Sequence, residues 1–141
     1  AGEQYKIPGN VRYITTNLYS DKPDGLSGNE DCGQMSAWYI LSSMGFYPLN
    51  PSNGAYVFGS PLFDEVTLSL EGEKNLKIIA ENNSDTNIYI QKVILNGAEH
   101  KFSYITHKDL VKGGELKFIM GSTPNLKFGK EKKYRPQSIV Y

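Results

Sequence analysis

Residues 31–48 of the chain read DCGQMSAWYILSSMGFYP and hold its strongest helix signal. The pattern predicts a helix from Gly33 to Met44. Gly45 suits the position after a helix, and Pro48 prevents the helix from continuing. Apolar side chains surround this helix on almost every side, and only three small serines interrupt them. We therefore expect other elements to cover the helix on several faces.

The residues before and after this helix set the fold class. Another helix is expected at Gly9–Tyr19, where apolar residues share one face. After Pro51 the pattern becomes that of short strands with hairpin spacing. One helical turn is expected at Thr106–Lys112, with Thr106 as its cap. The chain thus reads as an α+β protein whose antiparallel strands form a β-sandwich or a single curled sheet. The predicted strands are Ala55–Phe58, Glu65–Leu70, Leu76–Glu81, Ile88–Leu95, Glu99–Tyr104 and Glu115–Met120.

Length, charge and cysteine content narrow the classes of function. The 141 residues suffice for one domain with a core, or for a small domain with an attached fragment. Basic and acidic residues balance at 15 each, so nucleic acid and anionic membranes are not expected as partners. No apolar stretch is long enough to span a bilayer, and no signal peptide is expected at Ala1. Cys32 is the only cysteine, which excludes an internal disulfide, and we expect it to pack as a small residue.

The densest polar cluster is residues 24–34, DGLSGNEDCGQ, directly before the predicted helix. Its three glycines allow the backbone to approach a ligand closely, and a carboxylate on such a loop can face a cleft while the helix holds it. The simpler interpretation is that Asp31 caps the helix, with Gln34 completing a capping box. Asn29, Glu30 and Asp31 also offer oxygen ligands for calcium, although the loop does not match the EF-hand pattern.

Several segments together resemble glycoside hydrolase family 92. Residues 23–39, PDGLSGNEDCGQMSAWY, look like the most characteristic block of that family. The similarity continues through MGFYP at 44–48 and YVFGSPLF at 56–63, and through SYITH at 103–107 in the predicted strands. It extends from about Ala1 to Gly129.

The resemblance implies a calcium-dependent exo-α-mannosidase that inverts the anomeric configuration. Such enzymes pair an N-terminal β-sandwich with a large (α/α)6-barrel. Residues 1–50 would be the end of that barrel, with the acidic loop 24–34 and the helix 33–44. Residues 51–129 would form an antiparallel β domain, and residues 130–141 a polar tail. The expected substrate is an α-mannoside or N-glycan mannose, with α-1,2 linkage favoured, and the expected location is periplasmic or secreted.

The resemblance also suggests roles for three residues of the loop. The family's general base belongs to the acidic loop before this helix, which makes Asp31 the candidate. Asn29 stands where some members carry another aspartate, and its amide can position water or substrate but cannot take a proton. Glu30 is expected to bind substrate or to support the loop. The general acid and most calcium ligands are expected outside this chain, so the chain alone is expected to be inactive without the remaining catalytic barrel.

Two other functions remain open from the residues alone. Strands rich in tyrosine suit a non-catalytic carbohydrate-binding module, because an aromatic ring can stack on a sugar. A purely structural β module that supports the barrel is the other alternative. Trp38, inside the predicted helix, is expected to be core rather than a sugar platform. His107 is expected to be a hydrogen-bonded structural residue.

Overall fold

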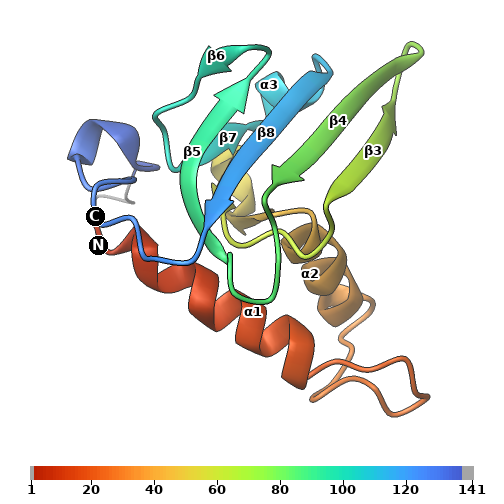
Figure 1. The fold of residues 1–141 in the computed structure, drawn as a ribbon. Coiled ribbons are helices and arrows are strands. Elements are labelled where there is room, and N and C mark those ends of the chain that lie inside the picture. Colours follow the sequence, from red (N-terminus) through yellow and green to blue (C-terminus); the bar gives the residue numbers. More distant parts are fainter. Residues whose placement is uncertain (1, 138–141) are drawn as a thin grey trace.

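Two helices lie on one side of two β-sheets in the computed structural model, which describes residues 2–137 (Figure 1). Helix α1 (Ile7–Asn17) follows a short 3-10 turn, η1 (Gln4–Lys6). Helix α2 (Gln34–Ser43) ends just before the first strand. Both predicted helices are confirmed, with ends shifted by one or two residues.

Eight strands form the two sheets within residues 2–137. The larger sheet has the order β3-β4-β8-β5-β6, and the smaller has the order β1-β2-β7. All neighbouring strands are antiparallel except β4 and β8, which run parallel. This arrangement confirms the predicted α+β class. The strands are β1 (Phe46–Asn50), β2 (Ala55–Phe58), β3 (Glu65–Leu70), β4 (Lys74–Glu81), β5 (Tyr89–Leu95), β6 (Ala98–Glu99), β7 (Tyr104–Thr106) and β8 (Gly114–Gly121).

Two regions differ from the predicted strands. β1 was not among the predicted strands; it contains Pro48 and lies at the edge of its sheet, where a proline is tolerated. The predicted strand Glu99–Tyr104 is wrong, because the chain leaves β6 and enters the other sheet as β7. His100 Nε2 lies 2.7 Å from the carbonyl oxygen of Tyr104, and the residues between them lie outside any strand.

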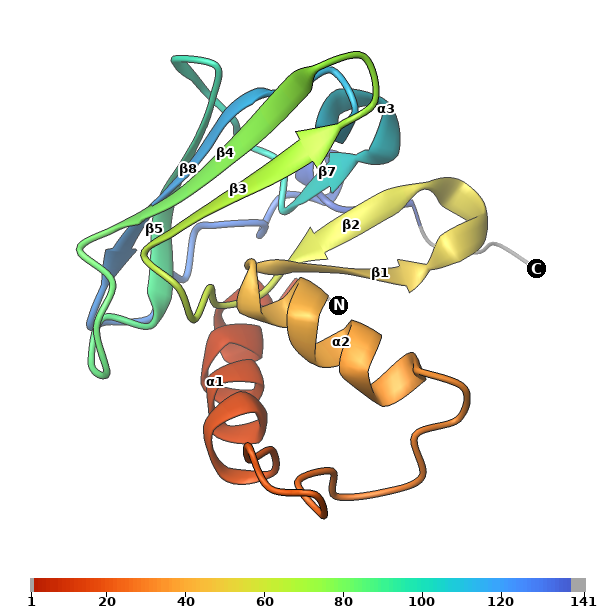
Figure 2. The ribbon, with the colours of Figure 1, turned by 90° about the vertical axis from the view of Figure 1, so that its right-hand side faces the viewer.

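The hydrophobic core lies between the two sheets (Figure 2). Phe46 and Phe58 enter it from the smaller sheet, and Leu76, Leu116 and Phe118 enter from the larger one. The rings of Phe58 and Phe118 meet edge to face, with their centroids 5.2 Å apart. This core gives the helices a rigid surface on which to pack.

Short elements complete the chain. The 3-10 turn η2 (Pro51–Asn53) joins β1 to β2, and α3 (His107–Leu110) follows β7. The predicted cap at Thr106 is confirmed, since its Oγ1 accepts a bond from Asp109 N at 3.2 Å. The structural role expected for His107 agrees with its Nδ1 lying 3.2 Å from the Tyr56 hydroxyl oxygen. Part of the predicted polar tail forms η3 (Lys132–Tyr134), and residues 138–141 of that tail lie outside the described residues.

Helix α1 is fastened to the β region through a buried arginine. Arg12 is only 8% exposed, and its Nη2 donates to the carbonyl oxygen of Pro61 at 2.5 Å and to Asn83 Oδ1 at 2.7 Å. Burial lowers the pKa of Arg12, while the carboxylates of Asp85 and Asp64 partly offset this effect. A buried charge is tolerated only when such partners replace water. Arg12 therefore fixes how α1 sits against the strands.

Helix α2 is buried at one end only. Its C-terminal residues Ser42 and Ser43 are 3% and 0% exposed, whereas Ile40 is 58% exposed and Ala37 is also exposed. The expectation that several elements cover this helix is therefore not met within residues 2–137. An apolar side of α2 faces solvent.

Replacing Arg12 with alanine should destabilise the chain by about 2–4 kcal/mol, because it leaves the Pro61 and Asn83 oxygens buried without a donor. Urea denaturation followed by circular dichroism measures the change. Lys92→Ala, at an exposed position of β5, is the control and should shift stability by less than about 0.5 kcal/mol. Equal stabilities of the two variants would contradict this role for Arg12.

Candidate active site

The acidic loop 24–34 lies at the end of α2 that is farther from the sheets (Figure 2). A closed turn precedes it, in which Ser20 N donates to Gly25 O at 3.0 Å and Gly25 N donates to Lys22 O at 2.9 Å. A Cβ at Gly25 would collide with the Ser20 carbonyl oxygen, so this close approach requires glycine. The turn brings the chain back toward α2 and fixes where the acidic loop begins.

Three successive residues of the loop have positive φ angles. The values are 47° at Asp31, 60° at Cys32 and 96° at Gly33. Glycine adopts this region freely, but other L-residues lose about 1–2 kcal/mol each. Backbone strain of this kind clusters at functional sites. The loop thus keeps two strained residues in the position where the sequence analysis placed the catalytic base.

Glu30, not Asp31, accepts hydrogen bonds from the first turn of the helix. Its carbonyl oxygen accepts bonds from Gly33 N at 3.2 Å and from Gln34 N at 2.9 Å. Its side-chain Oε1 accepts from Ser36 N at 3.3 Å. The expected capping by Asp31 is wrong, because the N-cap position is held by Gly33 and no side chain caps it there. The capping box expected for Gln34 is therefore also absent from this helix start.

Asp31 and Asn29 are both exposed, so their side chains are open to water and to a ligand. Cys32 is exposed as well, and its expected role as a packing residue is therefore wrong. Glu30 differs from its neighbours, since its Oε2 is buried and has no hydrogen-bond partner among the described residues. The loop therefore presents Asn29 and Asp31 outward and holds Glu30 inward.

Aromatic rings brace α2 behind the loop. Tyr19 stacks on Trp38 with their centroids 5.7 Å apart, and its hydroxyl donates to the Met35 carbonyl oxygen at 3.2 Å. Burial raises the pKa of Tyr19, and the nearby charge of Glu30 adds to this shift. Trp38 is half-buried instead of being fully in a core. Tyr19, two residues after α1, thereby supports the helix next to the loop that carries Asp31.

The described residues do not form a metal site by themselves. In the range 2–137, no three His, Cys, Asp or Glu side chains come together in a way that could hold a metal ion. Glu30 and Asp31 thus lack a third such ligand within this part of the chain.

The sequence analysis proposed Asp31 and Asn29 as site residues and expected Glu30 to bind substrate or to support the loop. It missed the bonds of Glu30 to the helix start and the role of Tyr19. These bonds of Glu30 had no clear signal, because Asp31 fits the same rule and is one residue closer to the helix. The brace by Tyr19 depends on a contact across the turn 20–25, which residue spacing does not reveal. In the sequence, only Gly33 after these two residues indicated a left-handed backbone near Asp31 and Cys32.

Comparisons with known proteins place this chain within a family. The family model described as the glycosyl hydrolase family 92 catalytic domain matches residues 1–122. A protein of Arthroderma benhamiae described as an uncharacterized secreted glycosidase is 30% identical over 106 residues, which are 73% of this chain and 14% of that protein.

Two solved structures from Bacteroides thetaiotaomicron are also similar. A family 92 α-mannosidase in complex with mannoimidazole is 39% identical and superposes with a TM-score of 0.92 over 98% of this chain and 18% of its own. A family 92 inverting mannosidase is 42% identical, with a TM-score of 0.90 over 97% of this chain and 19% of its own.

The chain thus spans less than one fifth of the length of these relatives. Within residues 2–137, no helix has both the length and the apolar content needed to cross a membrane.

Replacing Cys32 with glycine should stabilise the chain by about 0.5–1 kcal/mol, since the relief of left-handed strain exceeds the entropy cost of glycine. Replacing it with valine should destabilise the chain by at least about 1 kcal/mol, because a β-branched residue fits this region poorly. Urea denaturation of both variants measures the order of stability. If the valine variant were as stable as the glycine variant, the strain at this position would be refuted.

Proposed function

Because the chain belongs to glycoside hydrolase family 92, we propose that it supplies the water-activating carboxylate of an inverting α-mannosidase and that Asp31 is this carboxylate. The observation that carries the proposal is the exposed position of Asp31 on a strained loop held by α2. The printed description of one relative, an inverting mannosidase, supports the reaction class.

Inversion requires two carboxyl groups on opposite sides of the glycosidic bond, about 6.5–9.5 Å apart so that a water molecule fits between the base and the sugar. In the proposed step, the oxygen of that water attacks the anomeric carbon while the Asp31 carboxylate takes a proton from the same water. The bond from that carbon to the leaving oxygen breaks, and the leaving oxygen receives a proton from the acid. A catalytic base must be accessible to both water and sugar, and the exposed Asp31 carboxylate is.

The neighbours of Asp31 receive different roles. We propose that Asn29 orients the attacking water or a sugar hydroxyl, because its amide can donate and accept hydrogen bonds but cannot remove a proton. Substrate binding by Glu30 stays a prediction. The contacts of Glu30 with Gly33, Gln34 and Ser36 favour a supporting role, in which it holds the backbone on either side of Asp31.

The intact enzyme needs parts that we place outside this chain. We propose that the general acid and most of the calcium ligands belong to the remaining catalytic barrel, because this chain spans 18% of one solved relative and 19% of another. In the same proposal, residues 1–50 end the barrel and residues 51–129 form its supporting β domain. Calcium dependence, preference for terminal α-1,2-linked mannose of N-glycans, and a periplasmic or secreted location belong to this proposal as well.

In a longer protein that joins this chain to the remaining catalytic domain, Asp31→Asn should lower the rate of mannose release by about 10²–10⁴-fold. The amide keeps the shape of the side chain but cannot accept the proton of water. Asp24→Asn, which removes another exposed aspartate of the same loop, is the matched control and should retain most of the rate. Release of mannose from an α-mannoside gives both rates, and comparable activity of Asp31→Asn and the wild type would exclude Asp31 as the base.

The 141-residue chain alone should release no mannose from α-mannosides, with or without calcium, because the general acid is missing from it. The measurement is a long incubation with a chromogenic α-mannoside and with mannobiose. Turnover that persists after further purification would show that the chain contains both carboxyl groups, against the proposed division of the site.

A further inference from the structure

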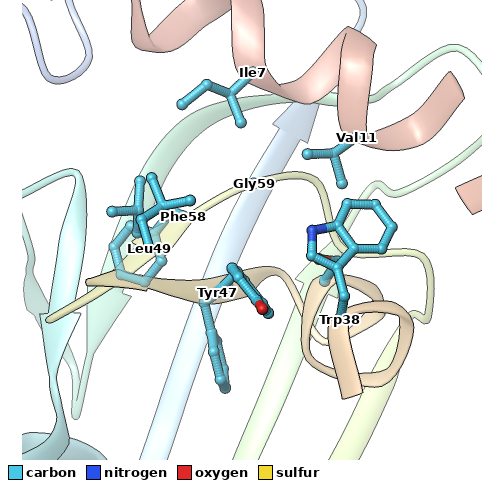
Figure 3. A pocket seen from close by; sticks show the side chains of 10 residues that line it. Ile7, Val11, Trp38, Tyr47, Leu49, Phe58 and Gly59 are labelled. Atoms are coloured by element: carbon cyan, nitrogen blue, oxygen red, sulfur yellow. The ribbon is translucent and has the colours of Figure 1, made fainter. Parts of the chain in front are cut away.

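A small apolar pocket lies between α1, α2, β1 and β2 (Figure 3). Ile7 and Val11 border it from α1, Trp38 from α2, and Leu49 and Phe58 from the two strands. The cavity has a volume of about 70 Å³, and none of its lining residues is charged. It lies apart from the acidic loop, since its α2 wall is formed by Trp38 and Ser42 rather than by the first turn.

The size and chemistry of the pocket select the kind of occupant. Pockets for small molecules usually measure about 300–1,000 Å³, so this cavity is too small for a sugar residue with its hydroxyl groups. A sugar would also leave its hydroxyl groups without hydrogen-bond partners on an apolar wall, which is unfavourable. An aliphatic side chain fits both the volume and the lining.

One wall of the pocket is open to solvent in this chain. Leu49 is 70% exposed, although it lies beside the buried residue Phe58. Covering a leucine side chain removes apolar surface from water and so favours association. Leu49 and the pocket together therefore form a surface that gains free energy when another apolar group seals it.

We propose that this pocket seats an aliphatic side chain from the remaining part of the family 92 catalytic domain. The inference rests on the proposed function, in which that part completes the enzyme. All lining residues fall within residues 7–59, inside the range matched by the catalytic-domain model, and the solved relatives are more than five times as long as the part that matches this chain. A segment of the same domain is thus the occupant that the comparisons favour over another copy of this chain.

Seating this side chain would affect the candidate active site. Trp38 lines the pocket with one part of its ring system and stacks on Tyr19. Tyr19 in turn bonds to the Met35 carbonyl oxygen in the first turns of α2. An occupant that fixes Trp38 therefore limits the motion of α2 and of the loop that carries Asp31. The pocket is in this way a docking point that links assembly of the domain to placement of the base.

The test follows the reactivity of a cysteine placed at position 49. Leu49→Cys is introduced in a Cys32→Ser background, both in this chain and in the longer protein that contains the remaining catalytic domain. Labelling by a maleimide at low protein concentration should be at least about 100-fold slower in the longer protein. Leu126→Cys, at another exposed leucine outside the pocket, is the control and should react at similar rates in both proteins.

Each other outcome overturns the inference. Equal labelling rates at position 49 in the two proteins would show that nothing covers the pocket. Equal protection at positions 49 and 126 would show that the longer protein shields both positions alike, with no specific binding in the pocket. Protection in this chain alone, either with rising protein concentration or on addition of mannose, would identify another copy or a sugar as the occupant. Because labelling requires no turnover, this inference and the assignment of Asp31 can fail independently.

Discussion

The arrangement depends on the close approach of the chain to the core at Gly45, between α2 and β1. Its φ of 101° favours glycine, and a Cβ there would lie 3.0 Å from the Phe118 ring and 3.2 Å from Pro61. The carbonyl oxygen of Gly45 also accepts a bond from Gly59 N at 2.9 Å. This contact locks one end of α2 into the junction of the sheets. The position of the acidic loop at the other end follows from it.

The rigid C-terminal end of α2 and the strained loop at its N-terminal end together hold Asp31 in one position. The core holds the C-terminal end through fully buried residues such as Ser43 and Phe46. At the N-terminal end, Glu30 holds the backbone while Asp31 and Cys32 occupy an unfavourable conformation. A catalytic group must be held closely in place by its supporting residues, and a rigid helix supplies that support better than a free loop. The stability of the β region thus offsets the strain of the loop.

Much of the fold could be predicted from the sequence, because its signals are local. The alternation in β3 and the glycine that ends α2 each act over a few residues, and both were predicted. The path of residues 99–106 was predicted wrongly because one end of this segment joins the larger sheet as β6 and the other end joins the smaller sheet as β7. The parallel pairing of β4 with β8 likewise joins strands that are far apart in the sequence.

The site was predicted less completely, and the reason is again physical. The residue types of the loop predicted Asp31 as a candidate, but the backbone angles that expose it come from hydrogen bonds to Glu30. The exposed apolar side of α2 agrees with the sequence, in which an almost wholly apolar helix stands in a chain with few other helices to cover it. The open pocket at Leu49 could not be predicted, because it depends on how two helices and two strands meet.

The central claim is that Asp31 faces the attacking water on the side of the sugar opposite to the leaving oxygen. It is tested most directly by an experimental structure of the longer family 92 protein with a bound mannose analogue. The account predicts a water molecule hydrogen-bonded to the Asp31 carboxylate, with another carboxyl group about 6.5–9.5 Å away across the anomeric carbon. An Asp31 side chain that points away from the sugar, or that is sealed off from water, would contradict it.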